Sequence, residues 1–320
     1  MGHSPEPRLD MLTSLPYFLR IPLALLLLVL NTVLHIVPLM VLALIKVVVP
    51  VAAVRKPLSR VMVAIAESWI GVNNALYRVF TRIDWQVEGL EGLRREGNYL
   101  VLCNHQSWVD IAVLQKVFNR RIPFLRFFLK QQLIWVPLLG MAWWALDFPF
   151  MKRYSAQTLM RHPELQGKDR ETTRKACEKF RHMPVSVMNF AEGTRFTQAK
   201  HDTRKSPYRY LLRPKAGGVA FVLDAMGEAL HAVLDVTIVY PEGPCTMMDL
   251  LAGRVHEVRV HVRERPLDPA WIGSYDQDPA FRGRIKTWVQ ALWQEKDAQV
   301  ARMQQQDWLR GDKLHGAGRS

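Results

Sequence analysis

The sequence predicts an α/β fold in which helices flank a central mixed sheet of about seven strands, preceded by an N-terminal membrane-anchoring helix or helical hairpin. Short apolar runs of strand-forming residues alternate along the chain with longer segments of helical periodicity. Two of these runs end in polar motifs that contain His105 and Glu192, and an uncharged apolar run precedes all of them. At 320 residues and 49% hydrophobic content, the chain can bury the core of one main domain with an appendage.

The uncharged run extends from Ile21 to Ile45 and follows a polar tail, residues 1–20. It exceeds the roughly 20 apolar residues that span a bilayer as a helix, and it is too long for the apolar core of a signal peptide. Asn31 and Pro38 interrupt it, so a kinked or re-entrant segment stays open beside a single span, and a buried core helix is the remaining alternative. His35 is interpreted as structural.

Basic residues around this run indicate its orientation. Lys46 and three further cations between residues 55 and 60 favour a cytoplasmic C-terminal side by the positive-inside rule, while Arg8 and Arg20 oppose it. Val61–Phe80 predicts an amphipathic helix that lies in the membrane interface or packs as an ordinary domain helix. The expected divisions are a polar tail over 1–20, an anchor with its linking helix over 21–82, the main domain over 83–305 and a C-terminal tail over 306–320.

Charge and cysteine content narrow the classes of function. The net charge of +14 suits nucleic acid, an anionic membrane surface or phosphorylated substrates. The three cysteines are isolated, so neither a disulfide framework nor a zinc site is indicated, and a reducing compartment fits. The sequence contains no internal repeat, nucleophile elbow, P-loop or dinucleotide fingerprint.

The most informative stretch is Asn98–Asp110. Tyr99–Cys103 is apolar and rich in strand-forming residue types, which predicts a buried strand. His105 follows in the turn, and Ser107 opens a helical pattern that carries Asp110. The imidazole then lies at the carboxyl end of a strand, the edge at which open α/β sheets tend to keep their chemistry.

His105 and Asp110 predict a general base with an orienting carboxylate. Histidine has the ordinary pKa closest to neutrality, and a carboxylate that accepts from one ring nitrogen leaves the other free to take a proton. The two side chains can meet only if His105 precedes the helix and Asp110 lies within its first turn. The structural alternative is a capping box, with Ser107 as the cap and Asp110 reaching back to a backbone N–H.

A second motif, Phe-Ala-Glu-Gly-Thr-Arg at residues 190–195, follows the strand pattern of Val185–Phe190. Gly193 permits a turn with unusual dihedral angles, and the guanidinium of Arg195 is a two-pronged donor that suits phosphate. Glu192 is expected to orient Arg195 or a backbone amide rather than act as a second base. A purely structural turn is the alternative.

Further elements are expected on either side of the two motifs. Strands are predicted over Trp85–Glu88, Ile122–Leu125, Leu234–Tyr240 and Val255–Val262, and helices over Phe127–Trp135, Asp169–His182, Ala216–Leu230 and Pro279–Gln305. The segment Phe196–Lys215 is basic and irregular, which fits contact with phosphate headgroups. Nucleic acid is the competing interpretation of this segment, but no nucleic-acid-binding motif supports it.

The pairing of Asn-His-x4-Asp at residues 104–110 with the motif at 190–195 resembles the PlsC-like glycerolipid acyltransferase family, which includes 1-acylglycerol-3-phosphate acyltransferases. Residues 130–140 look like the family's second conserved block, and Phe128–Leu133 with Trp293–Asp297 resemble the bacterial inner-membrane YihG type. The run Asp235-Val236-Thr237 departs from the Val-Pro-like pair usual in the family, which leaves the identity of the acceptor open.

The resemblance implies a glycerol-3-phosphate acyltransferase-like fold and transfer of an acyl chain from acyl-CoA or acyl carrier protein to a lysophospholipid hydroxyl, most directly that of 1-acylglycerol-3-phosphate. It gives His105 and Asp110 the catalytic roles. The substrate-binding residues that it implies are Lys130, Arg153, Glu192, Gly193, Thr194 and Arg195. Ordinary surface charge is the alternative for Lys130 and Arg153. Acyl-CoA or acyl carrier protein is a co-substrate, and no cofactor or metal is expected.

Other functions stay open at this stage. The acceptor could instead be lysophosphatidylglycerol or lysocardiolipin, or the chain could be a non-catalytic membrane-anchored lipid-binding protein. A soluble hydrolase would need neither an anchor nor phosphate-binding cations. Membrane lipids, the lysophospholipid and the acyl donor are the expected partners, without nucleic acid, and the expected location is the bacterial inner membrane with the main domain facing the cytoplasm.

Overall fold

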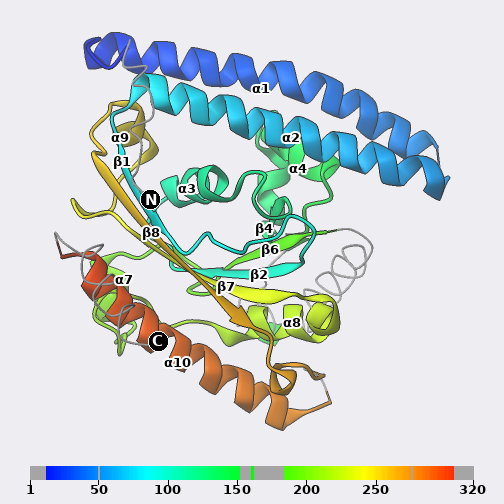
Figure 1. Cartoon of the computed structure of the whole chain (residues 1–320), viewed down its shortest axis with the longest axis vertical. Helices are drawn as coiled ribbons and strands as arrows, with labels where there is room; N and C mark the ends of the chain where they lie inside the picture. The colour runs from blue at the N-terminus through cyan, green and yellow to red at the C-terminus, as the bar shows by residue number, and fades with distance from the viewer. Residues whose placement is uncertain (1–11, 50, 152–159, 162–183, 275–276, 306–320) are drawn as a thin grey trace.

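A computed structural model describes residues 12–49, 51–151, 160–161, 184–274 and 277–305. Its centre is a six-stranded mixed sheet in the order β1-β8-β7-β2-β6-β3, in which only the β7–β8 pair is antiparallel (Figure 1). The strands are β1 (Asp84–Glu88), β2 (Tyr99–Cys103), β3 (Leu125–Phe127), β6 (Ser186–Phe190), β7 (Ala232–Val239) and β8 (Glu257–Pro266). A separate two-stranded sheet pairs β4 (Leu129–Lys130) with β5 (Phe150–Met151).

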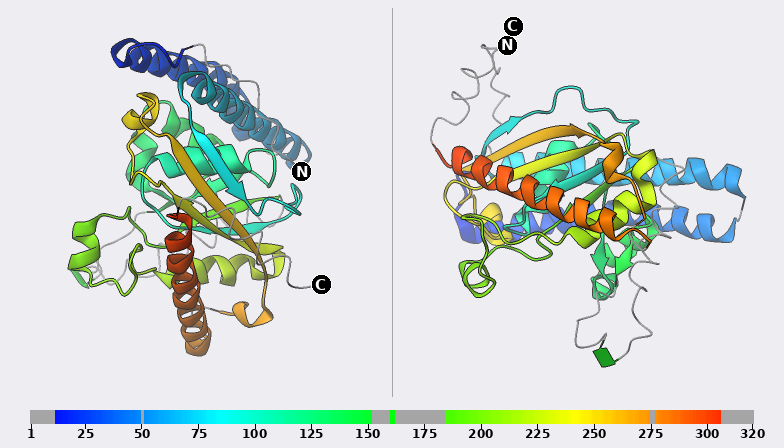
Figure 2. Two further views of the ribbon diagram at one scale, coloured as in Figure 1. Left: turned by 60° about the vertical axis from the view of Figure 1, so that its left-hand side comes forward. Right: turned by 90° about the horizontal axis from the view of Figure 1, so that it is seen from below.

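Helices cover both faces of the sheet. One face carries α1 (Tyr17–Val48), α2 (Ala52–Phe80), α3 (Val109–Phe118), α4 (Leu139–Ala145) and α9 (Met247–Leu251), and the other carries α8 (Ala216–Met226) and α10 (Pro279–Met303) (Figures 1 and 2). The short α7 (Gln198–Thr203) lies in the segment after β6. Single 3-10 turns occur at Gln131–Trp135, Gly227–Ala229 and Pro269–Trp271.

Strand β2 is the central element because its side chains supply both hydrophobic layers. All five residues of β2 are buried, as expected for a strand with parallel neighbours on both sides. Tyr99, Val101 and Cys103 pack into the layer beneath α3, whereas Leu100 and Leu102 pack toward α8 and α10. Successive side chains of a strand point to opposite faces, so this uninterrupted apolar run fills two layers at once.

Helices α1 and α2 form a hairpin with polar contacts between its two arms. Asn31 donates from Nδ2 to Asn73 Oδ1 at 2.8 Å. The ring of His35 contacts Asn31 O at 2.9 Å and Ser68 Oγ at 3.2 Å, which agrees with its structural interpretation. Such side-chain hydrogen bonds hold helices together where apolar packing alone gives little preference.

Helix α1 is one continuous helix, with Pro22 and Pro38 inside it, and is long and apolar enough to cross a membrane by length and composition. Both of its ends contact the sheet domain, residues 84–305. Near its start, Arg20 donates to the carbonyl oxygen of Ala252, and near its end Lys46 pairs with Asp147 at 2.5 Å. The outward face of α1 between these contacts is apolar and exposed.

Several predicted elements differ from the structure. Within the described part of the chain the sheet has six strands, where about seven were predicted, and the strand expected over Ile122–Leu125 is β3, shifted toward the C-terminus. The helix expected over Phe127–Trp135 is wrong: this segment holds β4 and a 3-10 turn, because the strand pairs with β5, a partner distant in sequence. Helices α4 and α7 were not expected. The predicted helix Asp169–His182 lies outside the described residues.

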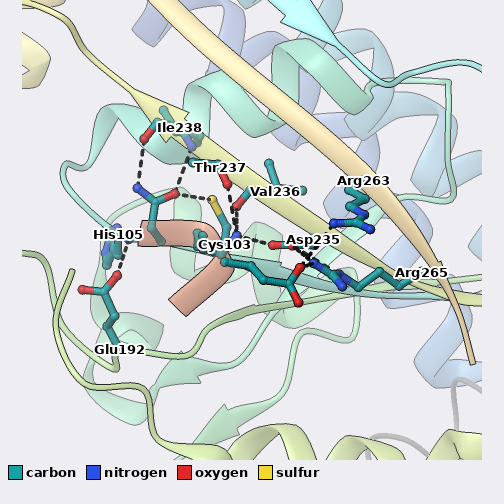
Figure 3. A network of polar contacts seen from close by, with 12 residues as sticks. Cys103, His105, Glu192, Asp235, Val236, Thr237, Ile238, Arg263 and Arg265 are labelled. Carbon is teal, nitrogen blue, oxygen red and sulfur yellow. Dashed lines mark hydrogen bonds and ion pairs between the residues drawn. The ribbon is translucent and has the colours of Figure 1, made fainter. Parts of the chain in front are cut away.

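A buried ion pair joins α10 to β7. Lys296 is fully buried, donates to Asp235 Oδ1, and reaches Val236 O at 2.6 Å (Figure 3). Arg265 of β8 pairs with the same carboxylate at 3.0 Å. Burial alone would raise the pKa of Asp235, but the two cations outweigh it and hold that pKa below its usual value. The run Asp235-Val236-Thr237 is therefore explained by its contacts with α10.

Replacing Lys296 with methionine tests how much this ion pair contributes to the free energy of unfolding. The variant Lys296→Met leaves a buried carboxylate with Arg265 as its remaining partner, so we expect a loss of roughly 3–5 kcal/mol in the free energy of unfolding. Denaturant unfolding of the detergent-solubilised chain measures it. The control Lys286→Met changes an exposed lysine of the same helix and should shift stability by less than about 0.5 kcal/mol. Equal stability of the two variants would contradict this account.

Candidate active site

The turn that follows β2 is fastened to the neighbouring strand β7 by Asn104. Its amide donates to Ile238 O at 2.9 Å and accepts from Ile238 N–H at 2.9 Å. Asn104 is completely buried, and both the N–H and the oxygen of its amide find partners in the backbone of one residue, Ile238. This two-point contact fixes where the chain leaves the sheet and hence where His105 begins.

His105 and Asp110 meet as expected. The Nδ1 atom of His105 lies 2.8 Å from Asp110 Oδ2, and Asp110 is completely buried at the start of α3. The same oxygen accepts from the backbone N–H groups of Gln106 at 2.7 Å and Ser107 at 2.9 Å. The carboxylate of Asp110 therefore accepts from the backbone N–H of Ser107, as the capping-box alternative predicted. It also holds the imidazole of His105, as the catalytic interpretation predicted. The helix begins at Val109, whose N–H donates to Ser107 Oγ.

Tyr240 completes the environment of Asp110 and was not expected as a site residue. Its hydroxyl donates to Asp110 Oδ1 at 2.7 Å from the residue that follows β7. Burial, with the neighbouring Asp110, raises the pKa of Tyr240 well above its usual value, so the phenol keeps the proton that it donates. The sequence signal that could have identified Tyr240 is its position at the end of the predicted strand Leu234–Tyr240. That strand is β7, which runs parallel to β2, so both strands end at the same edge of the sheet.

Contacts fix both the tautomer and the orientation of His105. Because the carboxylate of Asp110 can only accept, Nδ1 of the ring carries a proton in this contact, and Nε2 is left to take one. The ring stacks on Phe190 with centroids 3.9 Å apart and an interplanar angle of 16°, and Phe190 in turn stacks near Phe127. The side chain of His105 is 13% exposed, so the ring lies at the edge of the core rather than within it.

Glu192 holds two segments of the site together. Its carboxylate is completely buried and accepts from the N–H of His105 at 3.3 Å (Figure 3). It also accepts from the N–H of Leu212 at 3.2 Å. Burial raises the pKa of Glu192 to about 8, although the two N–H groups favour its charged form. Its contacts are with backbone amides, one of the two arrangements expected from the sequence.

The turn after Glu192 places the rest of the second motif beside His105. Gly193 has a φ of +69°, a conformation that favours glycine, and its N–H donates to Phe190 O at 2.9 Å. The N–H of Phe196 donates to His105 O at 2.7 Å. The two motifs are therefore joined by main-chain hydrogen bonds, and a side chain added at Gly193 would meet Lys215 Cδ at 3.3 Å.

Thr194 and Arg195 follow Gly193 in the second motif. The guanidinium of Arg195 is exposed and stacks over Trp108 at 5.1 Å from the ring centroid. Lys200 of α7, which lies in the basic segment Phe196–Lys215, donates to Thr194 Oγ1 at 3.0 Å and to Arg195 O at 3.0 Å. These contacts bring a second cation to the motif and keep the loop that carries Arg195 in place.

Two further predicted residues are not among those that these contacts bring together. Lys130 is exposed in β4 and is not among the described residues that the contacts above join to His105. Arg153 lies outside the described residues. Among the described residues, no three His, Cys, Asp or Glu side chains gather in a way that could hold a metal ion.

The fold and the site define an α/β protein with a buried carboxylate–imidazole pair at the carboxyl edge of its sheet. The family model described as Acyltransferase matches residues 84–248, which is more than half of the chain. The chain belongs to the Acyltransferase family. The closer likeness to the YihG type stays a prediction.

Curated relatives with similar sequences are named as acyltransferases. The chain is 26% identical over 234 residues to 1-acyl-sn-glycerol-3-phosphate acyltransferase gamma of Mus musculus, covering 69% of this chain and 57% of the relative. It is 25% identical over 215 residues to the delta form of Homo sapiens, covering 63% of this chain and 52% of the relative. The chain thus spans only a little over half the length of these relatives.

The solved structure is the 1-acyl-sn-glycerophosphate acyltransferase PlsC of Thermotoga maritima. It is 17% identical, with a TM-score of 0.47 over 85% of this chain and 95% of that chain.

The pKa of Glu192 predicts a measurable pH dependence of stability. A carboxyl group whose folded pKa is raised holds its proton in the folded state up to about pH 8 but loses it near 4.5 when unfolded. Wild-type stability should therefore fall as pH rises between these values, relative to Glu192→Gln, which cannot ionise. We expect the difference in unfolding free energy to grow by roughly a few kcal/mol over that window. If the unfolding free energies of the wild type and of Glu192→Gln changed by the same amount between pH 5 and 8, the raised pKa of Glu192 would be contradicted.

Proposed function

We propose that this protein is a membrane-attached acyltransferase that moves a fatty acyl chain from a thioester donor to the free hydroxyl of 1-acylglycerol-3-phosphate, giving phosphatidic acid. The observation that carries the proposal is the 2.8 Å contact between His105 Nδ1 and the buried carboxylate of Asp110, within the family-model match. Curated relatives are named as 1-acyl-sn-glycerol-3-phosphate acyltransferases, which supports this acceptor over other lysophospholipids.

The proton transfer is assigned to His105. Its Nε2 takes the proton of the acceptor hydroxyl while the hydroxyl oxygen attacks the carbonyl carbon of the thioester. Asp110 stabilises the imidazolium that forms, and Tyr240 with two backbone N–H groups holds that carboxylate so that it cannot turn away. Collapse of the tetrahedral intermediate breaks the carbon–sulfur bond, and His105 returns the proton to the departing thiolate.

Acceptor binding is assigned to the second motif. The guanidinium of Arg195 offers paired N–H donors to a phosphate, and its position over Trp108 places that charge beside the turn that carries His105. Phosphate held there fixes the acceptor hydroxyl near the base, which lowers the entropic part of the barrier. Gly193 and Thr194 shape this loop, Glu192 fastens it to the His105 turn, and Arg153 and Lys130 are assigned auxiliary roles in phosphate binding.

Membrane attachment is assigned to the outward face of α1. Helix α1 contributes a long row of exposed leucine and valine side chains, and only a small part of its most apolar stretch is buried. Both ends of α1 contact the sheet domain, so we propose that the helix lies along the lipid surface with the sheet domain on one side. The bacterial inner membrane, with the sheet domain in the cytoplasm, is the location that fits an acyl-CoA or acyl carrier protein donor.

Replacing His105 with alanine tests the assignment. We expect kcat for acyl transfer to 1-acylglycerol-3-phosphate to fall by about 10²–10⁴-fold, because the proton acceptor is lost. Purified full-length protein in detergent is assayed with acyl-CoA and with acyl carrier protein as donors, and the unfolding midpoint shows whether the variant still folds. The control His256→Ala removes an exposed histidine that pairs with Glu242 and should keep full activity.

Two outcomes would contradict the assignment. Near-normal turnover by a folded His105→Ala protein would show that His105 is not the general base. Absence of turnover by the wild-type protein with every lysophospholipid and donor would favour the alternative of a lipid-binding protein that keeps the motifs as structure.

A substitution at Arg195 tests phosphate recognition. In Arg195→Lys the charge is kept but the paired donors are lost, so we expect the KM for 1-acylglycerol-3-phosphate to rise roughly 10-fold. The KM for the acyl donor should stay unchanged in the same assay. Arg204→Lys, at an exposed arginine just after α7, is the matched control and should leave both constants unchanged. A rise confined to the donor KM would show that Arg195 binds the other substrate.

A further inference from the structure

A pocket of about 440 Å³ lies between α8, α10 and the segment that enters α8. Its walls carry three basic side chains, Arg213, Arg282 and Lys286, and no carboxylate is among the residues that line it. Ala216, Ala220 and Val289 form an apolar part of the lining. A concave site of this size with few, convergent charged groups on an apolar base is typical of small-molecule binding rather than of a solvated surface.

The three cations reach the pocket from two directions. Arg213 precedes α8, whereas Arg282 and Lys286 lie one helical turn apart in the first half of α10. All three are exposed residues, and Arg213 and Lys286 present their charge to solvent. Phosphate groups are the anions that arginine and lysine clusters bind best, because several N–H donors converge on several oxygens.

The pocket is linked to the candidate active site through the chain that enters α8. Leu212, next to Arg213, donates its N–H to Glu192, whose other oxygen accepts from the N–H of His105. Two residues after Arg213, the N–H of Lys215 donates to Ala191 O at 2.7 Å. One end of the pocket is therefore joined to the motif that carries Arg195 by two hydrogen bonds from backbone N–H groups.

The position of the pocket favours a ligand that arrives from water. Helices α8 and α10 cover the face of the sheet opposite to α1 and α2 (Figures 1 and 2). The apolar outward face of α1, to which membrane attachment is assigned above, therefore lies on the far side of the sheet from the pocket. A lysophospholipid with its acyl chain in the bilayer would have to cross the sheet domain to reach it.

We propose that this pocket binds the nucleotide phosphates of coenzyme A and so holds the acyl donor, an inference that rests on the proposed acyl transfer. Coenzyme A carries a pyrophosphate and a ribose phosphate, enough negative charge to engage cations on two sides of a pocket. Its adenine can cover the apolar part of the lining. An acyl carrier protein would need a broad contact surface, whereas the three cations surround a concavity. The thioester arm then extends from the pocket toward the turn at His105.

The test uses a double variant, Arg213→Gln with Lys286→Gln, in the full-length protein. Binding of coenzyme A is measured by titration calorimetry in detergent, and the Kd should rise at least about 10-fold, which corresponds to about 1.4 kcal/mol. In the acyl-transfer assay the KM for acyl-CoA should rise to a similar extent, while kcat and the KM for 1-acylglycerol-3-phosphate stay unchanged. Arg284→Gln, between two pocket cations in sequence but outside the pocket lining, is the matched control and should leave all three constants unchanged.

Every other result overturns the proposal. Unchanged binding of coenzyme A in the double variant, equal losses in Arg284→Gln, a rise only in the lysophospholipid KM, or a loss confined to acyl carrier protein as donor would each do so. The binding measurement needs no turnover. A protein that lacked acyl transfer but lost coenzyme A binding in the double variant would therefore contradict the proposed function and support the pocket.

Discussion

The carboxylate of Asp110 is the group on which the arrangement of the site depends. It is completely buried and accepts four hydrogen bonds, from the ring of His105, two backbone N–H groups and the hydroxyl of Tyr240. A buried carboxylate with fewer donors would be costly, so its burial requires that the turn after β2, the start of α3 and the end of β7 all meet at one point. The imidazole is held there as one of four partners, in a single tautomer and orientation.

The rest of the fold keeps those three segments together. Asn104 binds the N–H and the C=O of Ile238 in β7, and Lys296 of α10 reaches the same strand from the opposite face of the sheet. Strand β7 is therefore held at Ile238 by Asn104 and, two residues earlier, at Val236 by Lys296. Glu192 performs the matching function on the other side of β2, where it joins the second motif to the His105 turn. Main-chain groups are the partners in most of these contacts, which explains how the site can be rigid although much of it lies in turns.

The sequence predicted local elements well and distant pairings poorly. Tyr99–Cys103 and the later strands were recognised because an apolar run with turn residues on either side is a local signal. The His105–Asp110 contact followed from spacing, since a turn and the first turn of a helix bring them within reach. Tyr240 was missed because it meets the site through strand pairing that only the folded chain defines, whereas Lys200 was predicted only as part of the basic segment Phe196–Lys215. The segment Phe127–Trp135 shows the same limit, because its strand exists only through its pairing with β5.

The two end contacts of α1 carry a consequence for how such an enzyme would work on a bilayer. A helix of 32 residues is about 48 Å long, and it is fastened near both termini to the body that carries His105. A protein tethered at one end swings and samples many heights above the lipid, whereas one fastened along such a length has a single depth and tilt. With the proposed attachment to a bilayer, acceptor molecules would reach the protein by lateral diffusion in a plane, and the distance of His105 from the headgroups would not change.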